Sequence, residues 1–106
     1  DICGKRGRSM ATFFVVNIQI PNQSERSGYD EYIAQVKPIV ESYGGKYVAR
    51  SEQITQISGE IKLDRIIVIE FEDRQQLVTC FASPEYTSVK GLREMCVISN
   101  AYIVEQ

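Results

Sequence analysis

The sequence predicts an α+β fold in which a four-stranded antiparallel sheet is covered on one face by helices. Three observations lead to this class. The chain has 106 residues, a length typical of one domain. Stretches with strand-like alternation of apolar residues are separated by stretches with a helical period. These stretches follow one another in the order strand, helix, strand, strand, helix, strand.

The first predicted strand covers residues 12–20 and ends before Pro21. Apolar side chains occupy every second position, which predicts that one face of this strand lies against the helices. That face carries Phe14, Val16, Ile18 and Ile20, and the other face carries Phe13, Val15, Asn17 and Gln19.

A helix is predicted next. Ser27, with Asp30 three residues later, resembles a capping box at its start. Apolar residues then recur at steps of three and four as far as Tyr43. Pro38 lacks a backbone donor, so a kink or an early stop is expected there. The helix is expected to end at Gly44-Gly45, because glycine adopts the left-handed conformation at a helix end at little cost.

Two strands are predicted in the middle of the chain. Residues 46–50 form a short strand, and residues 53–57 have β character that predicts a hairpin arm or an extension of the sheet edge. Residues 66–71 are the richest in β-branched side chains, so we expect a central strand there.

The last third of the chain predicts a helix in two parts and a final strand. Asp73, with Gln76 three residues later, is expected to cap the start of the first part. Ser83 is expected to cap the second part, with Pro84 at the first helical position, where the missing donor costs nothing. Residues 97–104 form the predicted last strand.

This order of elements is that of the ferredoxin-like split βαβ fold, written βαββαβ. In that topology the first and third strands lie in the centre of the sheet. The strands in these positions are the two most apolar in the chain, which agrees with the prediction.

Helices on one face leave the other face of the sheet open. Its predicted apolar side chains are Phe13, Val15, Ile66 and Val68, and its polar ones are Asn17, Gln19 and Glu70. An exposed apolar patch of this kind marks an interaction surface. We therefore expect a homodimer through the open sheet face, with two protomers related by a two-fold axis.

Composition excludes several classes of function. The chain has no histidine, which removes the Ser-His-Asp triad and the usual zinc and iron sites. The formal net charge is −2, so a nucleic-acid partner is not expected. No apolar stretch is long enough to predict a membrane span. We expect no metal, no cofactor, and a cytoplasmic location in which Cys80 and Cys96 are buried free thiols.

The domain is expected to cover residues 10–106. Residues 1–9 have no apolar periodicity and precede Met10, so they are interpreted as an expression remnant or a disordered lead-in.

Several segments together resemble a bacterial family known only as a domain of unknown function, number thirteen-thirty, in the dimeric α+β barrel superfamily. One of these segments is Arg65-Ile66-Ile67-Val68-Ile69-Glu70-Phe71, and the most specific are the Gly44-Gly45 turn and Ser83-Pro84-Glu85-Tyr86. The resemblance runs from Met10 to the C-terminus. It implies a ferredoxin-like protomer that pairs sheet to sheet, and no established activity.

The candidate site residues come from strand ends and from the open face. Glu70 is a carboxylate within a central strand, so it is a candidate acid or base, with pairing to Arg50 or contact with water as the alternative. Arg50 could bind a carboxylate, and Tyr86 could donate a phenolic proton, although its helical stripe also suits packing. The catalytic candidates are therefore Glu70, Arg50 and Tyr86. The ligand-binding candidates are Asn17, Arg50, Glu70, Arg93 and Tyr102.

Two functional hypotheses follow from these residues. In the first, a small organic molecule is bound or transformed between the paired sheets without metal or histidine chemistry. In the second, the protein is a non-catalytic dimer for assembly or regulation, with a packed core between the sheets. Whether the protein is an enzyme stays open at this level.

Overall fold

A computed structural model describes residues 11–22, 24 and 26–106, and the side chains of these residues except 92–96. Four strands form one antiparallel sheet: β2 (Thr12–Gln19), β3 (Lys46–Ser51), β4 (Arg65–Phe71) and β5 (Ile98–Glu105). Their order across the sheet is β3-β4-β2-β5. The strands that come first and third along the chain, β2 and β4, are therefore central in the sheet. The predicted ferredoxin-like topology is confirmed.

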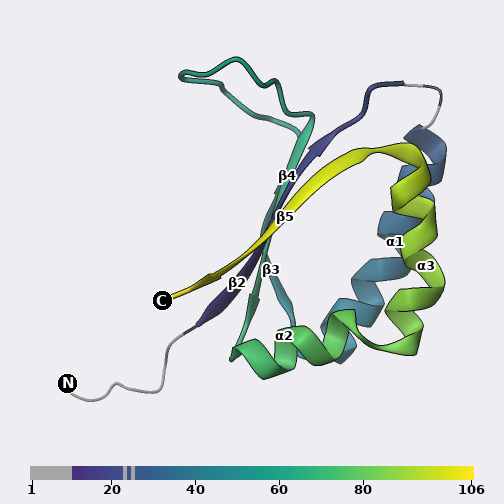
Figure 1. The fold of residues 1–106 in the computed structure, drawn as a ribbon, viewed down its shortest axis with the longest axis vertical. Helices are drawn as coiled ribbons and strands as arrows, with labels where there is room; N and C mark the ends of the chain where they lie inside the picture. The colour runs from purple at the N-terminus through teal and green to yellow at the C-terminus, as the bar shows by residue number, and fades with distance from the viewer. Residues whose placement is uncertain (1–10, 23, 25) are drawn as a thin grey trace.

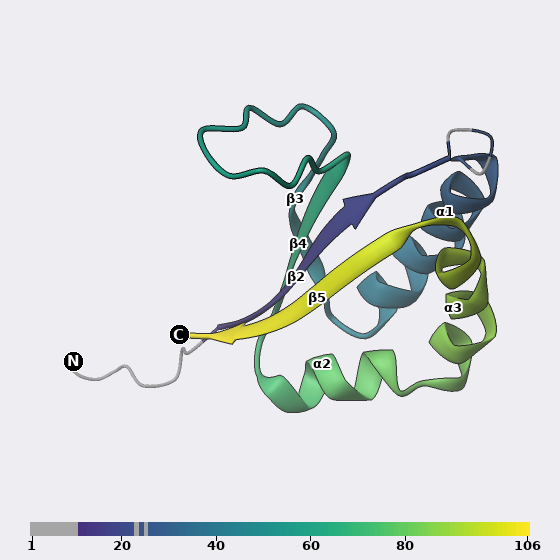
Figure 2. The same cartoon turned by 45° about the horizontal axis from the view of Figure 1, so that its top comes forward.

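Three helices form the second layer: α1 (Arg26–Ser42), α2 (Arg74–Phe81) and α3 (Pro84–Cys96). All three lie on one side of the sheet, with α1 and α3 side by side (Figures 1 and 2). None of the helices in the described part of the chain is long and apolar enough to cross a membrane.

The two faces of the central strands differ as the alternation predicts. Val16, Ile18 and Ile20 are buried on the helix-covered face, and Ile67, Ile69 and Phe71 join them from β4. The direct pairs Phe13–Glu70, Val15–Val68 and Asn17–Ile66 lie on the other face, because residues paired across an antiparallel ladder share a face. These side chains are only half-buried, and the predicted open face is present in the protomer.

Helix α1 departs from the sequence prediction at two places. It begins at Arg26, so Ser27 lies inside its first turn and the predicted capping box is wrong. Asp30 instead lies 3.9 Å from the Arg26 guanidinium, one turn away. The helix also continues through Pro38 to Ser42, so the proline does not stop it.

The end of α1 is a Schellman motif, as the two glycines predict. The amide of Gly45 donates to the Val40 carbonyl at 2.9 Å, and the amide of Gly44 donates to the Glu41 carbonyl at 3.1 Å. Gly44 adopts φ +92°, a conformation that disfavours any other residue. The motif turns the chain sharply into β3.

The two predicted caps of the second half are confirmed. The Asp73 carboxylate accepts a hydrogen bond from the Gln76 amide at 2.8 Å, and α2 starts at the next residue. The Ser83 hydroxyl accepts from the Tyr86 amide at 3.2 Å, and Pro84 is the first residue of α3.

The segment 53–57 is not a strand, which corrects the sequence prediction. It belongs to a long connection between β3 and β4 that leaves the sheet and projects from it (Figure 1). β propensity alone does not make a strand, because strand residues need a paired neighbour for their backbone groups. The lead-in at residues 1–9 lies outside the described residues.

Gly45 offers a test of the packing at the end of α1. A Cβ atom there would lie 2.5 Å from Val40 Cγ1 and 2.9 Å from two ring carbons of Phe71. We expect Gly45→Ala to lower the free energy of unfolding by about 1–3 kcal/mol, as overpacked cores do. Urea denaturation measures this. Gly91→Ala is the control. A Cβ atom at Gly91 meets no atom within 4 Å, and the higher helix propensity of alanine should raise the free energy of unfolding by up to about 1 kcal/mol. Equal stability of the two variants would contradict the prediction.

Candidate functional site

A cavity lies between the sheet and the helices of the single protomer. Its volume is about 60 Å³, and the space reaches about 470 Å³ when its opening to solvent is included. The lining is apolar and aromatic. It comprises Phe14, Val16, Ile18, Tyr29, Tyr32, Ile33, Val36, Val40, Tyr47, Ile67, Ile69, Phe81, Tyr86 and Ala101.

Aromatic rings form a continuous series along this cavity. Tyr29 and Tyr32 on α1 have ring centroids 6.0 Å apart, and Tyr86 on α3 meets Tyr32 edge-on at 6.4 Å. Phe81 then contacts Tyr86 at 4.9 Å and stacks on Phe14 at 4.3 Å. Offset and edge-on contacts of this kind hold the rings in fixed orientations. The cavity therefore has aromatic walls contributed by helices and sheet.

Phenolic hydroxyls supply the polar groups of this lining. The hydroxyl oxygens of Tyr32 and Tyr86 lie 3.1 Å apart in a buried position, and either can donate to the other. Burial raises the pKa of Tyr47 to about 12, so its hydroxyl keeps its proton at neutral pH. These phenols can donate hydrogen bonds to an acceptor atom inside the cavity.

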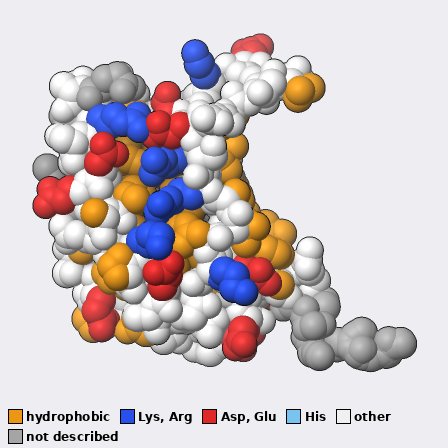
Figure 3. Space-filling model, turned by 180° about the vertical axis from the view of Figure 1, so that it is seen from behind, with side chains coloured by type: hydrophobic (Ala, Val, Ile, Leu, Met, Phe, Trp, Pro, Cys, Tyr) orange, Lys and Arg blue, Asp and Glu red, His pale blue; other side chains and the backbone are white. Residues whose placement is uncertain are grey.

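Basic side chains gather beside the cavity along α1 and the edge of the sheet. This basic rim consists of Arg26, Lys37, Arg50 and Arg65. Three of its members lie over a lining ring, two of them over Tyr47: Arg50 Cζ lies 5.3 Å and Lys37 Nζ 6.0 Å from the centroid of that ring. Arg65 Cζ lies 5.6 Å from the ring of Tyr29. Figure 3 shows Lys and Arg side chains gathered between helix and sheet, with apolar side chains beside them.

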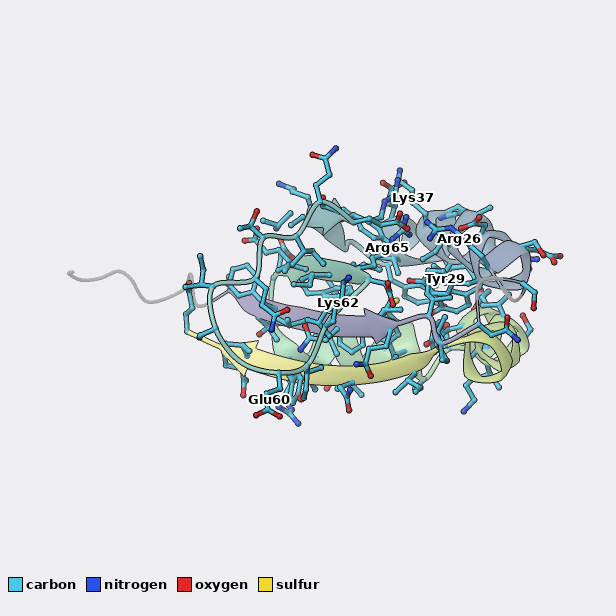
Figure 4. All side chains as sticks on the ribbon, turned by 90° about the horizontal axis from the view of Figure 1, so that it is seen from above. Arg26, Tyr29, Lys37, Glu60, Lys62 and Arg65 are labelled. Carbon is cyan, nitrogen blue, oxygen red and sulfur yellow. The ribbon has the colours of Figure 1, made fainter. Side chains whose placement is uncertain are left out.

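One carboxylate serves two arginines of the rim. Glu52 pairs with Arg26 and lies 3.2 Å from Arg65 Nη2. Two other nitrogens of Arg65, Nε and Nη1, are buried without a hydrogen-bond acceptor among the described residues. Figure 4 shows Arg65, Tyr29 and Arg26 close together beside α1. Positive charge is thus incompletely neutralised at this end of the rim.

Arg50 is the member of the rim that lies open to solvent. Among the described residues, no carboxylate forms an ion pair with it. It is paired with Ile67 on β4, whose side chain faces the helices. Arg50 therefore shares the helix-covered face with the cavity, and its guanidinium is available to an external anion.

Three of the predicted site residues lie on the open face and not at this cavity. Asn17 is paired with Asn100, Glu70 lies opposite Phe13, and Tyr102 lies opposite Val15 with 53% of its surface exposed. Glu70 also lies opposite Lys46 on β3. The expected Glu70–Arg50 pair does not form, because the two side chains lie on opposite faces of the sheet.

Tyr86 and Arg50 are the predicted residues that the structure brings to the cavity and its rim. Tyr86 is buried in the core and also lines the cavity. The side chain of Arg93 lies outside the described part of α3, and so does that of Cys96. Cys80 is fully buried, as expected, and is not in the cavity lining.

Sequence reasoning missed Tyr29, Tyr32 and Tyr47 as lining residues. Their positions in the apolar pattern suit core packing, for which leucine or valine would be sufficient. The choice of tyrosine could have indicated these positions. A buried phenolic hydroxyl requires a hydrogen-bond partner, so tyrosine is less favourable than an aliphatic residue where only packing is needed. No group of three or more potential metal ligands occurs among the described residues.

The hydroxyl pair can be tested by a double-mutant cycle. Tyr86→Phe removes one oxygen from a buried hydrogen bond, so we expect the free energy of unfolding to fall by about 1–2 kcal/mol. Tyr32→Phe and the double variant complete the cycle. If the two hydroxyls bind each other, the double variant loses less than the sum of the single losses. Strictly additive losses in urea denaturation would contradict this contact.

Several solved structures share the fold at low sequence identity. RPA0582 of Rhodopseudomonas palustris, a protein of unknown function, is 16% identical, with a TM-score of 0.78 over 93% of this chain and 84% of that chain. A dimeric ferredoxin-like protein of unknown function from Jannaschia sp. CCS1 is 10% identical, with a TM-score of 0.72 over 91% and 99% of the two chains. SnoaB, a cofactor-independent oxygenase from Streptomyces nogalater, is 12% identical, with a TM-score of 0.63 over 90% and 91%.

No curated protein matches the sequence. A family model does match, and it covers residues 11–106, nearly the whole chain. The match agrees with the segments singled out in the sequence and with the fold of the described residues. The chain belongs to the family described as domain of unknown function DUF1330.

Proposed function

We propose that each protomer binds a small aromatic carboxylate at the cavity between the helices and the sheet. The observation that carries this proposal is the direct contact between aromatic lining and unneutralised cation: Arg50 lies over Tyr47, and Tyr47 is part of the cavity wall. Ligand sites commonly combine an apolar wall with a few polar groups that fix orientation.

The aromatic part of the ligand follows from the shape and chemistry of the wall. A dry cavity of about 150 Å³ accepts benzene, whereas the cavity here is about 60 Å³ and opens to solvent. A single ring would therefore insert one edge and leave the other in the mouth. The rings of Tyr47, Tyr32 and Tyr86 offer stacking and edge contacts to such a ligand.

The carboxylate part follows from the charge beside that mouth. Arg50 presents a planar guanidinium that pairs with no carboxylate among the described residues, which suits two parallel hydrogen bonds to a ligand carboxylate. Lys37, near the same ring, already binds Glu41 at 2.9 Å and contributes less. Arg65 adds positive charge nearby, because Glu52 is shared with Arg26.

The proposal concerns binding at the cavity, and catalysis there would also need groups that act on the ligand. The oxygenase activity printed for SnoaB belongs to that protein, and a likeness of fold at 12% identity does not transfer it. In this chain, phenolic hydroxyls at Tyr32 and Tyr86 could orient a bound carbonyl or hold a proton near it. The proposal therefore concerns a binding protein, and an enzyme only if turnover is found.

Ligand-observed NMR with three probes tests the proposal. Benzoate, benzamide and cyclohexanecarboxylate separate the contribution of the charge from that of the ring. We expect benzoate to bind at least about tenfold more tightly than benzamide, since one charge-assisted hydrogen bond is worth about 1.5–3 kcal/mol. Arg50→Gln should abolish this preference. Arg74→Gln, which removes an exposed arginine paired with Glu105 on another part of the surface, should leave it unchanged.

Each outcome bears on a separate part of the proposal. If none of the three probes binds, a small-molecule site at this cavity is ruled out for this chemistry. If benzoate and benzamide bind alike in both variants, the ring is recognised and the carboxylate is not. If cyclohexanecarboxylate matches benzoate, the aromatic walls do not select an aromatic ligand.

We further propose that the protein is a homodimer through the open sheet face. Apolar side chains from three strands meet there: Val15 lies between Val68 on β4 and Tyr102 on β5 in the ladder. Two more exposed apolar side chains of β5, Ile98 and Val104, extend this surface. The Jannaschia structure is described as dimeric, which supports a homodimer here. In such a dimer Asn17, Glu70 and Tyr102 would lie between the sheets, which keeps them as a second candidate binding region.

Light scattering and sedimentation equilibrium test the dimer. The wild-type protein is expected at twice the chain mass of 12.0 kDa. Val15→Glu places a carboxylate in the centre of the apolar face, and its desolvation should weaken the dimer at least about tenfold. Val78→Glu on α2, outside the open face, is the matched control and should leave the dimer intact. A wild-type protein of 12.0 kDa at micromolar concentration would overturn the proposal.

The chemistry of the chain also supports a cytoplasmic location, as expected from the sequence. Cys80 is a buried free thiol, and burial raises its pKa to about 11, which keeps it protonated and unreactive. A stable free thiol is compatible with a reducing compartment.

A further inference from the structure

The connection between β3 and β4 carries the most exposed apolar side chains of the described chain. In this segment, residues 53–63, here called the arm, Ile57 is 90% and Ile61 70% exposed. Single exposed aliphatic residues are common on protein surfaces, but two that are mostly exposed on one projecting segment are typical of a contact surface.

The base of the arm is held firmly to the end of the sheet. The Asp64 amide donates to the Ile18 carbonyl at 2.8 Å, and the Asp64 carboxylate accepts from the Ile20 amide at 2.6 Å. On the same side, the Gln19 side chain donates to the Lys62 carbonyl at 3.3 Å. The direction in which the arm leaves the sheet is therefore fixed by hydrogen bonds to β2 and the residue after it.

The tip of the arm has its own turn. The Gln56 side-chain amide donates to the Gly59 carbonyl at 2.7 Å, and Gly59 adopts φ +96°. This turn encloses a hollow of about 330 Å³ that is open to solvent. The hollow is lined by Ile54, Gln56, Ile57, Ser58, Ile61, Lys62 and Leu63. Four of these side chains are aliphatic, and no described residue of the same protomer fills the space between them.

The arm projects toward the open face of the sheet and away from the helices. Figures 1 and 2 show it leaving the upper end of β3 and β4 on the side opposite α1 and α3. In Figure 3 it overhangs apolar surface, and Figure 4 places Glu60 and Lys62 along it, far from the helices. A protein packed on the open face would therefore meet the arm as well.

We propose that the arm clasps the second protomer of the homodimer, with Ile57 and Ile61 packed against the partner and partner side chains filling the hollow. This inference rests on the proposed dimer through the open face. A second copy is the occupant that the geometry favours, because the arm continues the apolar surface of that face. A two-fold axis would bring both arms into use, so each dimer gains two copies of the contact. Burying four isoleucines would add substantially to an interface whose sheet faces are half polar.

Sedimentation equilibrium on the double variant Ile57→Ser/Ile61→Ser tests the clasp. We expect its dimer dissociation constant to rise at least tenfold above that of the wild-type protein. Val78→Ser, an exposed valine on α2, is the control and should leave the constant unchanged. Urea unfolding in the monomeric Val15→Glu background separates dimerisation from folding. There the arm substitutions should leave stability nearly unchanged, because the side chains of Ile57 and Ile61 are 90% and 70% exposed within the protomer.

Photo-cross-linking locates the contact directly. A benzophenone amino acid at position 57, in a mixture of ¹⁴N- and ¹⁵N-labelled chains, should cross-link to peptides of the partner's sheet, with mixed isotope composition. A wild-type dimer whose dissociation constant is unchanged by the double variant would overturn the clasp and leave the dimer standing. A monomeric wild-type protein would overturn both. Cross-links confined to one chain would show that the arm folds back on its own protomer, which also overturns the clasp.

Discussion

The placement of the helices on a single face of the sheet governs the structure. One four-stranded sheet has two faces, and α1, α2 and α3 all lie on the same one. The chain crosses from strand to helix and back twice, and the strong preference for right-handed crossovers places the helices of both on the same face. Every residue of β2 and β4 is therefore assigned either to a covered face or to an open one. The cavity, the basic rim and the apolar open face all follow from this assignment.

On the covered face, the helices do not pack closely against the whole of the sheet, and a cavity remains between them. α1 and α3 pack against each other, and aromatic side chains span the space between them and the sheet. Aromatic side chains are long enough to reach from the helices to the sheet, but their flat rings leave gaps that branched aliphatic side chains would close. Tyr32 and Tyr86 satisfy each other's hydroxyls inside this layer. The same choice of residues that holds the layers apart thus produces both the cavity and its hydrogen-bond donors.

Charge is distributed according to the same division. The chain carries a formal charge of −2, yet four cations collect where α1 meets the edge of β3 and β4. Edge positions allow long side chains to place their aliphatic stems on aromatic rings while the charged ends remain near water. Arg50, on the edge strand β3, follows this arrangement over Tyr47, whereas Arg65, on the central strand β4, lies over Tyr29 with its guanidinium largely buried. A negatively charged molecule that approaches the acidic protein would be favoured at this edge.

The sequence by itself determined the elements, their order, and the face to which each residue of β2 and β4 belongs. Local chemistry was sufficient for these features: alternation for the strands, Gly44 and Gly45 for the end of α1, and Asp73 and Ser83 for the caps. Only the tertiary structure decided that Arg50 and Glu70 lie on opposite faces, since the register of β3 has an irregularity between Tyr47 and Ala49. It also decided that residues 53–63 leave the sheet and that three tyrosines line a cavity. Contacts between residues distant in sequence set these features, and no local pattern encodes such contacts.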